Sequence, residues 1–207
     1  MPSDAQHWEE IYTRTEPQAL PWNAGRPDPD LVRLVSSGKI PVGQALDIGT
    51  GPGHDAVYLI QRGFNVIGID ISPSAVKLAR ENASAAGLFG FFQQGDIRQI
   101  PVEDRFIDFT NDRGCFHVLA PEDRPKAVQE IGRVLRKGGL CLLHVFSDKE
   151  PPSPLPGERV QGAGPHRFTR KELEDLFEPK FKILQFWEGV FEGPRKPKSY
   201  SMLMEKK

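Results

Sequence analysis

The sequence predicts an α/β domain of three layers, in which a mainly parallel seven-stranded sheet ends in an antiparallel hairpin. Short apolar runs typical of buried strands alternate along the chain with segments whose apolar residues recur every three or four positions. This alternation favours parallel strands joined by helices that pack on the sheet. A short loop, and not a helix, separates the last two apolar runs, and this spacing predicts the hairpin.

Composition limits the organisation and the partners. The chain has 207 residues, enough for one α/β core and short of two ordinary domains. Its 27 basic and 28 acidic residues leave a net charge of −1, which gives no general attraction to nucleic acid or anionic membranes. Cys115 and Cys141 lie in or beside strand-like runs and make no disulfide framework. The start lacks the basic and apolar regions of a signal peptide. We therefore expect a cytoplasmic protein that binds neither nucleic acid nor membranes; composition does not indicate the oligomeric state.

Turn and capping residues set the limits of the expected elements. Ser72 followed by Pro73 is typical of a helix start, and Lys137-Gly138-Gly139 is typical of a helix end. The expected strands are one that ends at Asp47 and those over residues 64–69, 89–94, 106–110, 140–146, 181–191 and 199–204. The expected helices cover residues 3–12, 28–36, 54–62, 73–86, 124–136 and 169–177.

Four segments make up the expected single domain over residues 1–207. Residues 1–40 form an N-terminal helical cap, and residues 41–147 form the ligand-binding core. Prolines and glycines exclude a regular element between 148 and 164, so residues 148–168 are expected to form a long loop or lid. A C-terminal helix and hairpin complete the domain over residues 169–207.

A glycine-rich turn is the most informative motif. Asp47 ends an apolar strand, and Gly49, Gly51 and Gly53 follow at alternate positions before a helical pattern begins. Glycine permits positive φ angles and close approach to a ligand, and a helix N-terminus favours polar and anionic groups. Asp70 stands at the tip of the next strand, where a carboxylate can accept both hydroxyls of a ribose. The pattern predicts a cofactor that contains a nucleoside.

The same turn narrows the choice of cofactor. The third glycine of the dinucleotide fingerprint falls on His54, and Asp47 is unfavourable beside a pyrophosphate but suits a ligand with an ammonium and a sulfonium. D-x-G-x-G-x-G resembles the first motif of class I S-adenosylmethionine-dependent methyltransferases. The resemblance implies a Rossmann-like sheet, with the core over residues 41–147 binding S-adenosylmethionine.

Further positions carry the resemblance. It implies that Asp96 after the third strand holds the adenine amine, and that Ile97 offers its backbone N–H to the ring. The run D-R-G-x-F-H-x-L that begins at Asp112, with aromatic residues near the start of the chain, is similar to the small-molecule branch of the superfamily, including thiopurine S-methyltransferases and tellurite-resistance-type methyltransferases. The predicted cofactor-binding residues are Trp8, Tyr12, Trp22, Asp47, Gly49, Gly51, Gly53, Asp70, Ile71, Asp96, Ile97, Asp112 and Arg113.

Motifs of other methyltransferase chemistries do not occur in the sequence. The D/N-P-P-Y/F run of amino-methylating nucleic-acid enzymes is replaced by Asp112-Arg113-Gly114-Cys115, and Cys115 follows glycine where a cytosine-C5 enzyme needs proline. No acidic cluster for a metal is evident, so we expect none. These observations favour direct displacement by a soft nucleophile, a thiol or a selenium or tellurium acceptor, which needs no strong base.

Arg113, Asp112 and His117 are the candidate catalytic residues. Arg113 can bind the methionyl carboxylate, which the resemblance supports, or favour a nearby substrate anion. His117 can act as a base toward an alcohol or amine, so O- or N-methylation of a small metabolite stays open. A nicotinamide oxidoreductase and a non-catalytic S-adenosylmethionine-binding protein are the remaining alternatives.

Overall fold

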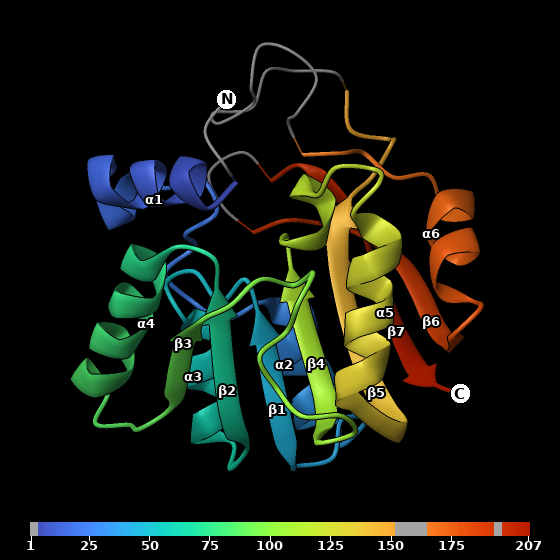
Figure 1. The fold of residues 1–207 in the computed structure, drawn as a ribbon, viewed down its shortest axis with the longest axis horizontal. Coiled ribbons are helices and arrows are strands. Elements are labelled where there is room, and N and C mark those ends of the chain that lie inside the picture. Colours follow the sequence, from blue (N-terminus) through green and yellow to red (C-terminus); the bar gives the residue numbers. More distant parts are fainter. Residues whose placement is uncertain (1–3, 152–164, 193–195) are drawn as a thin grey trace.

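A seven-stranded sheet forms the centre of the computed structural model, which describes residues 4–151, 165–192 and 196–207. Its strands are β1 (Gln44–Ile48), β2 (Asn65–Asp70), β3 (Phe91–Gln94), β4 (Ile107–Arg113), β5 (Leu135–Phe146), β6 (Phe181–Val190) and β7 (Lys198–Lys206). They lie in the order β3-β2-β1-β4-β5-β7-β6 (Figure 1). The first five strands are parallel to one another, and β7 is antiparallel to β5 and β6. The predicted fold class is confirmed.

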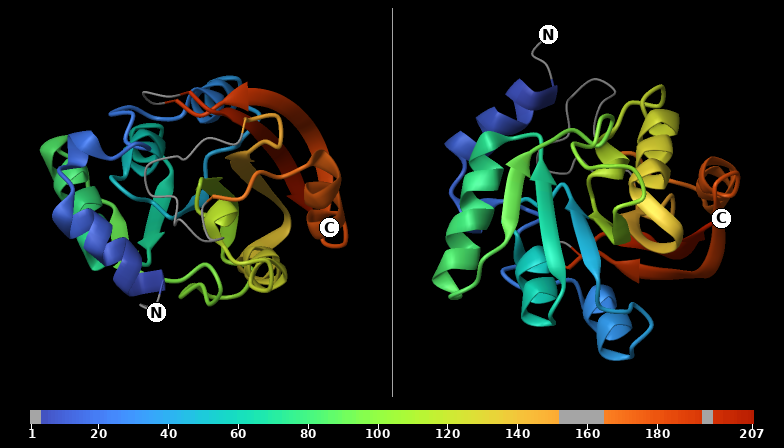
Figure 2. Two further views of the ribbon diagram at one scale, coloured as in Figure 1. Left: turned by 90° about the horizontal axis from the view of Figure 1, so that it is seen from above. Right: turned by 60° about the horizontal axis from the view of Figure 1, so that its bottom comes forward.

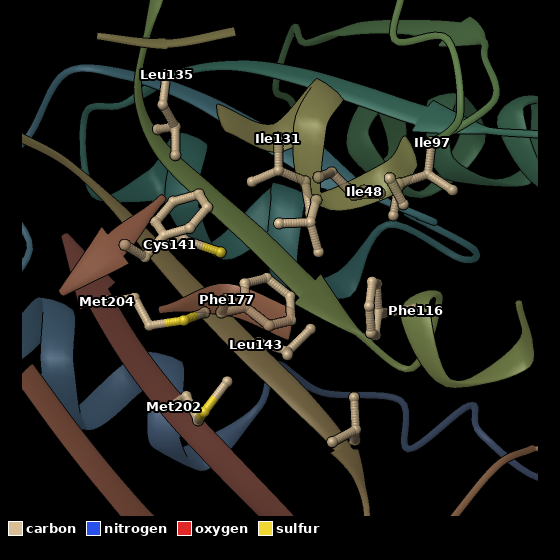
Figure 3. Close-up of a cluster of buried hydrophobic side chains, with 14 of the residues drawn as sticks. Ile48, Ile97, Phe116, Ile131, Leu135, Cys141, Leu143, Phe177, Met202 and Met204 are labelled. Atoms are coloured by element: carbon tan, nitrogen blue, oxygen red, sulfur yellow. The ribbon is translucent and has the colours of Figure 1, made fainter. Parts of the chain in front are cut away.

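Helices cover both faces of the sheet, which gives the three predicted layers (Figures 1 and 2). They are α1 (Asp4–Arg14), α2 (Pro29–Ser36), α3 (His54–Gln61), α4 (Pro73–Ala85), α5 (Arg124–Val134) and α6 (Arg170–Phe177), with short 3-10 helices η1 (Pro17–Ala19) and η2 (Phe116–Val118). The apolar sides of α2, α3 and α4 pack on one face, and those of α5 and α6 pack on the other. Figure 3 shows this second core, where Ile131, Phe177, Leu143 and Met202 meet.

Capping residues start the helices where the sequence indicates. The Ser72 hydroxyl accepts a hydrogen bond from the backbone N–H of Ala75, at 3.1 Å, ahead of Pro73. Thr169 and Glu172 form the reciprocal capping box of α6. Such caps satisfy N–H groups that have no partner within the helix. They fix the residues at which α4 and α6 begin.

The end of α5 differs from the prediction. The helix stops at Val134 and not at residue 136, because Leu135 is fully buried and pairs with Ile107 as the first residue of β5. The predicted helix cap at Lys137-Gly138-Gly139 instead forms an irregularity within β5, where Gly138 has a φ of +75°. Gly138 therefore allows a tight bend of the backbone, but this bend lies within a strand and not at the end of a helix.

Two other strands have different limits from those predicted. β3 begins at Phe91, two residues later than expected, and Phe89 is almost fully exposed. β4 runs on to Arg113, because Asn111, Asp112 and Arg113 pair with β5. Polar residues inside a buried strand were not expected from the sequence. They are tolerated because hydrogen bonds to other buried groups replace those to water.

The predicted lid falls mostly on residues 152–164, which lie outside the described residues, and its closure stays a prediction. Just after this segment, Phe168 returns to the sheet and forms a parallel bridge with Ser147. Within the described ranges, no helix combines the length and the apolar character that crossing a membrane requires.

Candidate active site

A cavity of about 530 Å³ opens at the carboxyl-terminal edge of the parallel strands. It lies at the point where the sheet order reverses between β1 and β4, the usual place for ligands in open α/β sheets. Its walls come from α1, from the turns that follow β1, β2, β3 and β4, and from Phe146 and Phe191. Figure 2 shows α1 above this edge in the view down onto the strands.

Each of the three motif glycines is required for a structural reason of its own. All have positive φ angles, +64° at Gly49, +50° at Gly51 and +80° at Gly53. A Cβ at Gly49 would lie 2.6 Å from the Cβ of Cys115, and one at Gly51 would lie 2.9 Å from the Tyr12 hydroxyl. Gly53 starts α3 and packs against Ala79 of α4. Among the three, Gly49 lines the cavity.

Asp70 stands at the tip of β2 and lines the cavity together with Ile71. Its carboxylate accepts hydrogen bonds from the backbone N–H groups of Gly51, at 3.0 Å, and Ser72, at 2.9 Å. Burial raises the pKa of Asp70 to about 6 in spite of these contacts. A carboxylate has about four lone-pair sites, so two can still accept from a ligand.

Asp96 and Ile97 also line the cavity, and the structure adds Arg98 to them. The Arg98 guanidinium contacts Asp96 at 2.6 Å, and reaches Asp4 of α1 at 2.9 Å and Asp123 at 2.8 Å. Burial alone would raise the pKa of Asp96, but the bonds from Arg98 hold it below its usual value. Arg98 was not predicted; its position two residues after Asp96 is the signal that could have indicated it.

Asp47 lies behind the glycine turn and is not among the residues that line the cavity. Its carboxylate accepts hydrogen bonds from the Thr50 hydroxyl, at 2.6 Å, and from the Asn111 amide, at 2.8 Å. Burial and then the nearby carboxyl of Asp55 raise the pKa of Asp47 to about 7. In this structure Asp47 supports the turn from below, and its predicted contact with the cofactor stays a prediction.

Arg113 faces the cavity from the end of β4 and is held by three contacts. Its guanidinium donates to the Asp28 carboxylate at 3.2 Å, to the Trp22 carbonyl at 3.2 Å and to the Glu192 carbonyl at 2.8 Å. Asp28, the N-cap of α2, also contacts His144 at 3.2 Å. Burial opposes the charge on Asp28, but His144 and Arg113 hold its pKa well below its usual range.

Asp28 is a residue that sequence reasoning missed. Its place before Pro29 indicates a helix cap. A cap explains why one carboxylate oxygen accepts hydrogen bonds from backbone N–H groups of α2, but it does not explain the contacts of the other oxygen. Asp28, Asp30 and His144 bring possible metal-ligand atoms within 4.8 Å of one another. The same Asp28 oxygen already meets Arg113 and His144, so the group is suited to orienting a guanidinium.

Asp112 holds the turn after β4 and does not line the cavity. One carboxylate oxygen accepts from the backbone N–H groups of Cys115, at 2.9 Å, and Phe116, at 3.1 Å. The other oxygen is buried without a hydrogen-bond partner in the described part of the chain. Burial raises the pKa of Asp112 to about 7. This arrangement fits a positioning role better than contact with a substrate.

His117 lines the cavity from η2, although the residue as a whole is only 5 % exposed. The backbone N–H of Phe146 donates to its Nδ1 at 3.2 Å. Its ring centroid lies 4.3 Å from that of Phe146 and 5.4 Å from that of Phe191. Burial, followed by the charges of His144 and Arg113, lowers the pKa of His117 to about 3.

Three aromatic residues of the N-terminal segment cover the cavity as one unit. Trp22 meets Trp8 and Tyr12 edge to face, with centroids 5.5 and 6.0 Å apart, and its indole N–H donates to the Tyr12 hydroxyl at 3.0 Å. α1 itself has no fully buried residue among those described. Glu9 holds it through hydrogen bonds from Ser72 and Ser74 at the start of α4, a clamp that the sequence did not reveal.

Comparison with known proteins agrees with this geometry. A protein-family model described as "Methyltransferase domain" matches residues 45–139. The 2-heptyl-1-hydroxyquinolin-4(1H)-one methyltransferase of Mycobacteroides abscessus is 30 % identical over 174 residues, which cover 82 % of this chain and 73 % of the relative. The chain belongs to the class I S-adenosylmethionine-dependent methyltransferases. S-adenosylmethionine is the cofactor of this methyltransferase.

Two further similarities concern sulfur chemistry and fold. A probable thiol methyltransferase 2 of Arabidopsis thaliana is 29 % identical, covering 91 % of this methyltransferase and 80 % of the relative. A structure reported for the conversion of a disulfide bond into a thioacetal group during echinomycin biosynthesis superposes with a TM-score of 0.84 and 24 % identity. That match covers 98 % of this chain and 92 % of the other, and it shows the shared fold.

The cavity of the methyltransferase fits the cofactor. The carboxylate of Asp70 can accept the hydroxyls of a ribose, and Gly49 presents backbone without a side chain to the cavity. Arg113 supplies a positive group for a carboxylate. Aromatic faces of the kind that Trp8 and Trp22 provide attract a cation.

Proposed function

We propose that this methyltransferase transfers a methyl group to the sulfur of a small thiol. The observation that carries the proposal is the hydrogen bond from the backbone N–H of Phe146 to Nδ1 of His117, the imidazole that the sequence offers as a general base. This bond occupies the lone pair of the neutral imidazole, and burial lowers the pKa of His117 to about 3. The ring is therefore poorly suited to remove a proton from an alcohol or amine at neutral pH. A thiol supplies its own nucleophile, because a few per cent of it is ionised at that pH.

The cavity supports such an acceptor in a second way. Next to His117, the wall consists of Val118, Leu119, Phe146 and Phe191, which exclude water and suit an apolar or aromatic molecule. Exclusion of water strengthens the attraction between an anionic sulfur and a sulfonium. The name of the Arabidopsis thaliana relative is consistent with this class of acceptor.

The chemistry needs alignment more than acid–base catalysis. S-adenosylmethionine supplies, when bound, a methyl group attached to a positively charged sulfur. The ionised acceptor sulfur forms a bond to the methyl carbon, and the electrons of the broken carbon–sulfur bond stay on the departing sulfur. The products are a thioether and S-adenosylhomocysteine, with no proton released in this step. Arg113, Asp70 and the aromatic cover hold the reactants in line, and such positioning can supply about 7–11 kcal/mol of the barrier.

An acidic hydroxyl is the second candidate acceptor. The Mycobacteroides abscessus relative is named for a hydroxylated heteroaromatic molecule, and a hydroxyl that is acidic enough also reaches the site without its proton. Ordinary alcohols and amines do not, because they need a base. The cytoplasmic location expected from the sequence stays a prediction, as does a small molecule as the partner.

Release of S-adenosylhomocysteine across a panel of acceptors tests the proposal. The panel contains thiophenol, 2-heptyl-1-hydroxyquinolin-4(1H)-one, phenol and aniline, with Asp70→Ala as the variant that identifies turnover dependent on this site. We expect thiophenol to be methylated fastest. Turnover of phenol or aniline without turnover of thiophenol would contradict the proposal.

A further inference from the structure

The proton of His117 has a defined place on the ring. A neutral imidazole carries one proton, on either Nδ1 or Nε2. The backbone N–H of Phe146 donates to Nδ1 at 3.2 Å, so Nδ1 is an acceptor and carries no proton. Burial keeps the ring neutral, with a pKa of about 3. The proton therefore lies on Nε2.

Nε2 is available to a ligand. The imidazole lines the cavity, and within the described ranges its Nε2 makes no hydrogen bond. Gly114 leaves this edge of the ring clear: a Cβ there would lie 3.4 Å from both Cε1 and Nε2. Gly114 has a φ of +91°, a conformation that glycine adopts readily. An N–H donor thus faces the cavity in an apolar wall.

The surroundings of the ring favour a negative partner. The charged and titratable groups that act on His117 are His144, Arg113 and His166, which are cationic or neutral. Phe146 and Phe191 pack against the ring and shield it from water. Hydrogen bonds to a charged acceptor are stronger than neutral ones, most of all where water is excluded.

We propose that His117 donates a hydrogen bond from Nε2 to the ionised acceptor atom, and so selects acceptors that enter the site as anions. This role rests on the proposed function and reverses the one that the sequence indicates. To act as a base, Nε2 would have to lose its proton to Nδ1, and the bond from Phe146 would then be lost. The imidazole orients the acceptor's lone pair toward the methyl group and excludes acceptors that present a proton of their own.

Two substitutions separate the two nitrogens. In His117→Asn, the amide oxygen can still accept from Phe146, but no donor extends as far as Nε2. In His117→Gln, the longer side chain can place an amide nitrogen near the position of Nε2. His54→Gln, on a histidine outside the cavity lining, controls for the loss of an imidazole. Circular dichroism and thermal unfolding with S-adenosylhomocysteine establish that each variant is folded.

The two probes are phenylmethanethiol, an alkyl thiol that is mostly protonated at neutral pH and must lose its proton, and thiocyanate, which has none to lose. If His117 is a donor, His117→Asn slows both reactions about ten- to hundredfold, and His117→Gln restores both to within about tenfold of wild type. A base role predicts a different pattern: both variants impair the reaction of phenylmethanethiol and spare that of thiocyanate. That pattern would overturn the inference. If His117→Gln does not fold, the thiocyanate rate of His117→Asn decides alone.

Failure of the proposed function is distinguishable from failure of this inference. Turnover of neither probe by the wild type would refute thiol methylation. The role of His117 is then judged by calorimetric binding of thiocyanate to the enzyme loaded with S-adenosylhomocysteine. Weaker binding in His117→Asn than in wild type supports the donor, and equal binding contradicts it.

Discussion

The two halves of the cavity are held in place by different means. The half that we assign to the cofactor is lined by Gly49, Asp70, Ile71, Asp96 and Ile97, and backbone conformation and N–H contacts at the ends of β1 and β2 fix it. The half that we assign to the acceptor is lined by His117, Val118, Leu119, Phe146 and Phe191, and packed rings and buried charges fix it.

This difference determines which substitutions each half can tolerate. A backbone turn with positive φ angles admits few side chains, so substitutions in the cofactor half should impair binding whatever the acceptor. A wall of rings can be rebuilt with other apolar residues at small cost, so the acceptor half can change specificity while the fold persists.

Gly49→Ala should have the largest effect. Its Cβ would lie 2.6 Å from that of Cys115, on a residue with a φ of +64°. We expect a turnover loss of about a hundredfold or more, since displacement of a site by about 1 Å can cost that much. Gly25→Ala is the matched control, because Gly25 has a φ of +66° and nothing within 4 Å of an added Cβ.

Urea unfolding and steady-state kinetics measure both variants. Gly49→Ala should be less stable than Gly25→Ala by about 1–3 kcal/mol. Both variants strain the φ angle equally, so this difference in the free energy of unfolding measures the close contact with Cys115. Equal losses in the two variants would show that conformation, and not close approach, requires the glycine.

Asp70→Asn should weaken S-adenosylmethionine binding by about 2–3 kcal/mol, or thirty- to 150-fold, if both ribose hydroxyls bond to the carboxylate. Asparagine keeps one oxygen, so one of the two backbone N–H groups, of Gly51 or Ser72, loses its acceptor, and urea unfolding establishes that the variant is folded. Wild-type affinity should also fall as the pH falls through about 6, where Asp70 gains a proton. Asp108→Asn, whose carboxylate accepts from the Gln44 N–H away from the cavity, is the control. Calorimetric titration with unchanged affinity would refute the assignment.

How much the sequence could predict follows the same division. Gly49 and Asp70 belong to one continuous motif of strand, glycine turn, helix and strand. Their spacing along the sequence was therefore enough to predict that both lie at the edge of the sheet where the cofactor binds. Asp28, Phe146 and Phe191 reach the cavity from distant segments, and no local spacing connects them. The predicted limits of β4 and β5 were wrong for a related reason. Burial and pairing with a neighbouring strand extended β4 through polar residues and started β5 before the glycines that had predicted a helix end.

Arg113→Gln probes the boundary between the halves. The guanidinium is held by Asp28 and two carbonyls and faces the cavity, so loss of its charge should weaken cofactor affinity about ten- to hundredfold. Arg26→Gln is the control, because Arg26 pairs with Glu192 nearby but is largely exposed. Titration with S-adenosylmethionine, together with the KM for thiophenol, measures both effects. A raised KM with unchanged cofactor affinity would move Arg113 to the acceptor.

Asp112→Asn should have the smallest effect on turnover and a distinct effect on stability. Burial raises the pKa of Asp112 to about 7, above its ordinary value of 3.8. The folded state therefore holds a proton that the unfolded state has lost between these values. The contribution of the neutral carboxyl is fully present below about pH 4 and is lost as the pH rises through about 7.

Asparagine at position 112 does not titrate, so Asp112→Asn should lose less stability than wild type between pH 5 and 8, by about 1–3 kcal/mol. Asp47 and Asp70 also have raised pKa values, so the variant should keep part of the pH dependence of stability. Asp96→Asn provides the opposite case in the cofactor half. Arg98 lowers the pKa of Asp96 below its ordinary value of 3.8, so this carboxylate stabilises the fold at neutral pH and its contribution is lost only below about pH 4. Asp96→Asn should therefore lower the stability by the same amount at every pH from 5 to 8. Urea unfolding at pH 5, 6, 7 and 8 compares the three proteins. Parallel curves for wild type and Asp112→Asn would show that the buried carboxyl is charged throughout and that the turn after β4 stabilises this charge.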